Sequence, residues 1–136
     1  MMNSNTRNKH QGFSLIELMV VVAILGLLAS IVMPAYQENV RTARRTDAMI
    51  ILAQIMQAQE RFFVNNITYT TALTDLGFAS NTVTSEAGFY QISAQACGGG
   101  INECVNLVAT AQGDQVEDGD LTINSQGLRT GNWETN

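Results

Sequence analysis

One stretch of this sequence constrains the fold more than any other. It is the apolar run from Phe13 to Met33, in which Glu17 is the only ionisable side chain. The run has 21 residues, and a helix of about 20 apolar residues crosses about 30 Å of hydrocarbon. A charge inside such a span costs about 2.5 to 3.5 kcal/mol on insertion scales, so it is normally kept where a partner neutralises it. The run contains no Lys or Arg, so the partner has to come from outside it.

A cut between Gly12 and Phe13 would supply such a partner. It would create an ammonium group four residues before Glu17, and on a helix that spacing places two groups on one face. A secretory signal peptide and a plain signal anchor also place basic residues before an apolar core. The secretory signal is the poorer match, because its core usually has about 7 to 15 residues. The end of this run also lacks two small residues spaced two apart, which the general signal peptidase needs.

The residues around this position resemble the prepilin signal of type IV pilins, in Lys9-His10-Gln11-Gly12-Phe13-Ser14-Leu15-Ile16-Glu17-Leu18-Met19. The likeness continues through residues 20–29, Pro34-Ala35-Tyr36-Gln37 and Arg44-Arg45-Thr46-Asp47-Ala48. It implies that a prepilin peptidase cuts after Gly12 and that Phe13 becomes the N-methylated first residue. It also implies that Glu17 pairs with the Phe13 amine of a neighbouring subunit while the filament assembles on its platform.

The predicted architecture is α+β, the pilin fold. We expect a leader at residues 1–12, a transmembrane and assembly helix at 13–34, and a globular domain at 35–136. The helix should run from Phe13 to about Val64, with Gly26 and Pro34 weakening it, because proline removes one backbone hydrogen bond and glycine is a poor helix former. Its second half carries an apolar stripe that can pack against a small antiparallel sheet, at Ala48, Ile51, Leu52, Ile55, Ala58 and Phe62.

Alternating apolar and polar residues predict the strands of that sheet. Two half-buried strands fit residues 89–96 and 105–111, a third fits 121–124, and a short turn fits 73–76. Asn65 and Asn66 are the expected end of the helix.

Two cysteines, Cys97 and Cys104, flank the loop between the first two of these strands. An even number of cysteines in an exported domain favours a disulfide, and the three glycines between them allow the loop to bend back. Zinc is the alternative, but two thiols with no histidine after residue 12 do not complete a four-ligand site. The positive-inside rule does not decide the orientation, because the basic residues on the two sides of the span are nearly balanced. The expected disulfide favours an external C-terminal domain, because disulfides persist in oxidising compartments.

The composition limits the chemistry. The formal net charge is −5, which repels polyanions at long range. Residues 13–136 contain no histidine and no Gly-x-Ser-x-Gly elbow, so we expect no enzymatic activity, no cofactor and no metal centre. One acidic loop leaves calcium open as an alternative to a solvated turn, with carboxylates at Asp114, Glu117, Asp118 and Asp120.

The sequence thus predicts a minor pilin of a bacterial type IV pilus, similar to the small class IVa minor pilins, that serves pilus biogenesis, twitching motility or adhesion. Segments 57–70 and 119–127 and Trp133 carry this second resemblance, although Asp118 and Asn132 stand where many such pilins have cysteines. The implied partners are other pilins, the peptidase/methyltransferase and the assembly platform. The precursor would lie in the inner membrane, with its leader cytoplasmic and its C-terminal domain periplasmic, before the subunit joins an extracellular pilus. A DNA-binding pilin and a type II secretion pseudopilin are the alternatives; few cations follow Arg45, so we do not expect nucleic acid as a partner.

Overall fold

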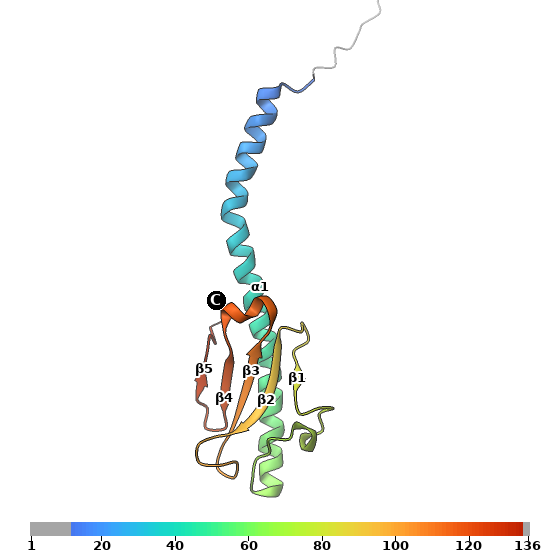
Figure 1. Ribbon diagram of the computed structural model, residues 1–136, viewed down its shortest axis with the longest axis vertical. Helices are drawn as coiled ribbons and strands as arrows, with labels where there is room; N and C mark the ends of the chain where they lie inside the picture. Colours follow the sequence, from blue (N-terminus) through green and yellow to red (C-terminus); the bar gives the residue numbers. More distant parts are fainter. Residues whose placement is uncertain (1–11, 135–136) are drawn as a thin grey trace, which may run out of the picture. The chain divides into compact units, whose positions relative to one another are not determined.

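A computed structural model describes residues 12–134 of the chain (Figure 1). The chain divides into two compact units, Met1–Gln37 and Glu38–Asn136, and each is described by itself. Residues 1–11 of the predicted leader lie outside the described range.

The first element is the helix α1, Leu15–Asn66, which is 52 residues long. It begins two residues later than predicted and ends two residues later, a difference within the usual uncertainty of helix ends. Pro34 lies inside it, and the helical assignment is continuous through both Gly26 and Pro34. By length and composition its N-terminal part is apolar enough to cross a membrane, and the apolar residues there are exposed.

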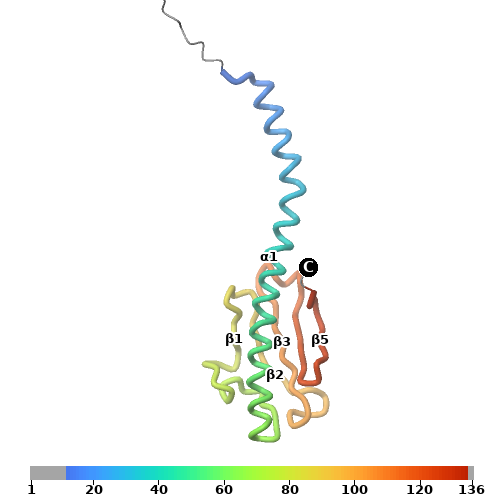
Figure 2. Tube along the Cα trace, turned by 180° about the vertical axis from the view of Figure 1, so that it is seen from behind, coloured from blue at the N-terminus to red at the C-terminus, as the bar shows by residue number. Residues whose placement is uncertain are grey.

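In the second unit, α1 packs along one face of a sheet (Figures 1 and 2). The predicted stripe is confirmed for Ala48, Leu52, Ile55 and Ala58, which are buried. The other two stripe residues are half-buried. Their spacing of three and four residues keeps them on one side of the helix, so burial here follows directly from the sequence period.

The sheet has five antiparallel strands in the order β1-β2-β3-β4-β5, each joined to the next in the chain. The three longer ones match the prediction closely: β2 is Tyr90–Ala96, β3 is Val105–Ala111 and β4 is Leu121–Asn124. The short edge strands β1, Val83–Thr84, and β5, Arg129–Thr130, were not predicted. Two residues are too few to show a sequence period, so these strands follow from pairing with their neighbours.

The core lies between α1 and the sheet. Fully buried side chains from three strands, among them Tyr90, Ile92, Leu107 and Leu121, meet the helix stripe there. The alternation in β3 is complete on this side, since Val105, Leu107, Ala109 and Ala111 are all buried.

Two short helices complete the unit. The predicted turn is the 3-10 helix η1, Leu73–Leu76, which ends at Gly77 with φ +92°. The second, η2, Gly113–Asp118, was expected as an acidic loop. Between α1 and η1, the buried amide of Gln59 holds the backbone of Thr70 at both ends, donating to its carbonyl at 2.6 Å and accepting from its N–H at 3.1 Å.

Candidate functional site

The N-terminal segment places the predicted processing residues just before the helix. Gly12, Phe13 and Ser14 precede α1, and the backbone N–H of Glu17 donates to the Ser14 carbonyl at 3.1 Å. Phe13 therefore lies before the first residue of α1, and its pairing with Glu17 of a neighbouring subunit stays a prediction. Ser14 and Glu17 have the spacing of a helix capping pair, a feature that was not predicted from the sequence. A carboxylate in the first turn also interacts favourably with the helix dipole.

The surface around Glu17 is almost wholly apolar. Phe13 is 81% exposed and Leu15 is 78% exposed, and every large apolar residue from 13 to 33 is at least partly open. A soluble monomer rarely exposes so continuous an apolar patch. The segment therefore requires lipid or other helices around it.

Gly26 and Pro34 lie within this helix without ending it. Pro34 has no backbone N–H, so the carbonyl four residues earlier, that of Ser30, lacks its usual helical donor. The Ser30 hydroxyl donates to the Leu27 carbonyl at 2.7 Å. Easy unwinding of this stretch in a filament stays a prediction, since it concerns a different environment.

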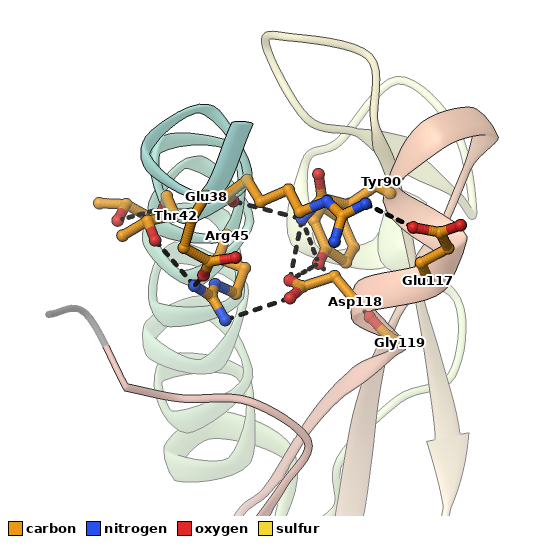
Figure 3. A network of polar contacts seen from close by, with 10 residues as sticks. Glu38, Thr42, Arg45, Tyr90, Glu117, Asp118 and Gly119 are labelled. Atoms are coloured by element: carbon orange, nitrogen blue, oxygen red, sulfur yellow. Dashed lines mark hydrogen bonds and ion pairs between the residues drawn. The ribbon is translucent and has the colours of Figure 1, made fainter. Parts of the chain in front are cut away.

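A buried arginine, Arg45, forms the most elaborate polar cluster in the second unit (Figure 3). It is 2% exposed. Its guanidinium donates to Asp118 at 3.1 Å, to Glu38 at 2.8 Å and to the Thr42 hydroxyl at 2.7 Å. The contact with Asp118 joins α1 to η2 across 73 residues of sequence. The burial of Arg45 was not predicted from the sequence.

Tyr90 and Gln115 complete this cluster on the sheet side. The Gln115 amide donates to Asp118 at 2.9 Å, to the Tyr90 hydroxyl at 3.3 Å and to the Arg41 carbonyl at 3.2 Å. Burial, together with the nearby negative charge of Asp118, raises the pKa of Tyr90 above its usual 10.0, although the bond from Gln115 acts the other way. Arg41 pairs with the exposed Glu117 next to the cluster.

Three of the four carboxylates considered as calcium ligands have other partners in the structure. Glu117 and Asp118 are each paired with an arginine, and Asp120 accepts the backbone N–H of Ala111 at 2.9 Å. Within residues 12–134 no group of three or more acidic, cysteine or histidine side chains is arranged to hold a metal ion. Glu117 and Asp118 are better explained by their ion pairs with Arg41 and Arg45, which hold this loop against α1.

The disulfide between Cys97 and Cys104 is present, with the two Cα atoms 5.3 Å apart. It closes the β2–β3 loop at the base of the hairpin. This loop also contacts the segment after α1, since the Tyr69 backbone N–H donates to the Ile101 carbonyl at 3.3 Å and Thr68 donates to Asn102 at 2.8 Å.

The remaining cations of the described chain are scattered. Arg44 stacks over the Phe89 ring at 3.5 Å and Arg129 lies over the Trp133 ring at 4.9 Å. Arg61 is exposed near the end of α1. Among residues 12–134, these three arginines are the basic side chains outside the ion pairs.

Comparisons with known proteins decide the family. Residues 34–122 match the family described as "Type IV minor pilin ComP, DNA uptake sequence receptor", and residues 7–33 match the "Prokaryotic N-terminal methylation motif". The chain belongs to the type IV pilin family. The predicted family and pilin fold are thus confirmed.

Individual pilins agree with this assignment. A fimbrial protein of Pseudomonas aeruginosa is 30% identical over 83% of this chain and 77% of its own length. A fimbrial protein of Neisseria meningitidis is 37% identical over 57% of this chain, and the match spans 45% of that protein. A solved type IV pilin from Shewanella oneidensis shares the fold, with a TM-score of 0.53 and 21% identity over 70% of this chain and 96% of that one. The chain thus spans about half the length of one relative and most of the other two.

Proposed function

We propose that this pilin is a minor subunit of a bacterial type IV pilus, made as an inner-membrane precursor and cut after Gly12. Phe13 then becomes the N-methylated first residue. Support comes from the methylation motif that matches residues 7–33, followed by an exposed apolar helix with a single carboxylate. The subunit acts by assembly, and we assign it no catalytic role.

Assembly exchanges one apolar environment for another. In the membrane, lipid surrounds residues 13–33; in a filament, the helices of other subunits take its place. Glu17 would pair with the ammonium group of Phe13 on a neighbouring subunit. This pair would fix the position of one subunit's helix along the next during that exchange. Gly26 and Pro34 would let the helix between them unwind where subunits crowd.

A Glu17→Gln variant tests the pairing. It should be inserted and cut normally, yet its amount in sheared filaments should fall by about tenfold or more, which corresponds to a lost interaction of about 1.4 kcal/mol. Glu86→Gln is the matched control, because Glu86 is exposed and lies in the turn before β2. Mass spectrometry of the filaments measures both the amount and the methylated terminus. Equal incorporation of the two variants would refute the pairing role, and an intact leader on wild-type protein would refute the processing.

DNA uptake is the second candidate function, because the family that matches residues 34–122 carries the name of a DNA uptake sequence receptor. Three arginines outside ion pairs, Arg44, Arg61 and Arg129, are the cations available for phosphate contacts in the described residues. The slope of log affinity against log salt is about −0.9 for each phosphate neutralised, so one subunit using all three would give about −2.7.

A gel-shift titration against salt separates the possibilities. A slope near the value for three contacts, reduced by about 1 in Arg61→Gln and unchanged in Arg41→Gln, would support a receptor acting through single subunits. A much steeper slope in assembled filaments would show that subunits pool their charges. Absence of retardation at low salt in both forms would exclude the receptor function.

A further inference from the structure

The face of the sheet opposite α1 has an unusual composition. Figures 1 and 2 show α1 on one side of the sheet, and no other described element covers the opposite side. Alternation directs every second side chain of each strand to that side. On β2 and β3 these are Gln91, Ser93, Gln95, Asn106, Val108 and Thr110.

This outer face carries no charge. β4 adds Thr122 and Asn124, and the edge strands add Thr84 and Thr130. All but Val108 are amides or hydroxyls, in a chain with 12 acidic and 7 basic residues. A polyanion finds no cation on this face, and a charged protein surface finds no complementary charge. The face therefore favours a neutral partner that is rich in hydrogen-bonding groups.

Three amides lie in register across the sheet. Gln95 pairs with Asn106, and Asn106 pairs with Asn124 on the next strand. Neighbouring strands are about 4.8 Å apart, so the row offers donors and acceptors at a regular spacing. A carboxamide both donates and accepts, as a sugar hydroxyl does.

A hollow of about 370 Å³ lies at one end of this row. The Thr122 and Thr130 hydroxyls meet at 2.7 Å beside it, and one of them keeps a proton to donate outward. Leu128, 65% exposed, gives an apolar wall. The Asn124 Oδ1 atom accepts the N–H groups of Gln126 and Leu128 at 3.1 and 2.8 Å, which fixes this side chain before any ligand arrives. Fixed polar groups beside an apolar wall are typical of ligand sites.

We propose that this hollow and the adjoining amide row bind a neutral oligosaccharide. The amides of Asn106 and Asn124 and the threonine hydroxyls bond its hydroxyl groups, and Leu128 contacts the C–H face of a sugar ring. The ligand lies on the outer face of the sheet, and its proposed contacts include none of the residues to which processing and assembly are assigned. Binding should therefore be unchanged in Glu17→Gln.

The test uses the mature full-length chain in a zwitterionic detergent without a sugar head group. Chitotetraose and maltotetraose are the neutral probes, and tetragalacturonate is an anionic probe of the same length. Calorimetry and amide chemical shifts should show saturable binding of at least one neutral probe, with little change between low and high salt because no ion pairs form. Tetragalacturonate should bind at least about tenfold more weakly. Absence of binding by both neutral probes overturns the proposal, as does equal binding of the anionic one.

Two variants locate the site. Asn106→Asp keeps the shape and adds a charge beside the hollow, and the double variant Thr122→Val/Thr130→Val removes both hydroxyls without leaving one unpaired; each should weaken binding by about threefold to tenfold. Gln91→Glu is the control, an amide-to-acid change on the same face but in the row that pairs with Thr110. Equal effects of Asn106→Asp and Gln91→Glu would overturn the assignment. Loss of filament incorporation in Asn106→Asp without any sugar binding would instead make the face a subunit contact.

Discussion

Asp118→Ala should destabilise the globular unit by about 3 to 5 kcal/mol, because removing one partner of a buried ion pair leaves the other charge uncompensated. The side chain of Arg45 is 3% exposed and that of Asp118 is 7% exposed, so water screens neither charge. Glu38 remains at 2.8 Å, but its side chain is 54% exposed, and exposed pairs contribute at most about 1 kcal/mol. Tyr90 and Gln115 lose an acceptor as well.

Thermal unfolding followed by near-ultraviolet circular dichroism measures this loss. For a domain of about 100 residues, 1 kcal/mol shifts Tm by about 4 to 8 °C, so the variant should melt at least about 10 °C lower. Asp114→Ala is the matched control, an exposed carboxylate of the same short helix, and it should change stability by less than about 0.5 kcal/mol.

A double variant separates the charge from the packing. Arg45→Met/Asp118→Leu removes both charges and should recover most of the lost stability, since apolar replacement of a buried pair is often neutral or stabilising. The reasoning is refuted if Asp118→Ala melts within about 3 °C of Asp114→Ala. It is also refuted if the double variant is less stable than Asp118→Ala.

Three further outcomes can be measured by urea and pH titration of stability. Replacing Cys97 and Cys104 by serine should cost about 2 to 3 kcal/mol, because the open loop regains chain entropy when unfolded; an unchanged urea midpoint would contradict this. The raised pKa of Tyr90 means that the folded state keeps a proton that the unfolded tyrosine releases near pH 10, so the contribution of Tyr90 to stability should be constant below about pH 10 and fall above it. Tyr90→Phe should flatten that fall, and an equally steep loss would exclude Tyr90 as its cause. Ile67 has φ +56° and is 78% exposed; Ile67→Asn should stabilise by about 1 kcal/mol, because asparagine adopts this left-handed conformation more readily than a β-branched residue, and a destabilised variant would show that the isoleucine side chain contributes a contact.

Much of the fold follows from periodicity in the sequence. The burial of Leu52 and Ile55 follows from three-to-four spacing, and β3 follows from strict alternation. The buried Arg45 was missed because an arginine in an amphipathic helix is normally solvated, and its partner Asp118 lies in a segment without a period of its own. The burial of Gln59 was not predicted either. It depends on Thr70, which lies beyond the end of α1 and whose backbone bonds the Gln59 amide.

The candidate sites also differ in how far the sequence alone predicts them. The N-terminal motif that matches residues 7–33 could be recognised because a charge in an apolar run has few explanations, and cleavage after Gly12 stays a prediction. The uncharged outer face could not be recognised before the registers of Asn106 and Asn124 placed their amides in one row.

The contact between Arg45 and Asp118 has a consequence for the timing of folding. Its two ends are 73 residues apart, and Gln115 reaches the Arg41 carbonyl across 74. During synthesis from the N-terminus, the arginine is made first and its buried counter-charge much later. Because distant contacts close slowly, Arg45 gains its buried counter-charge only after the segment that contains Asp118 has been made. A nascent chain that stalls before residue 113 would hold Arg45 without its buried counter-charge, which makes it a substrate for chaperones and proteases.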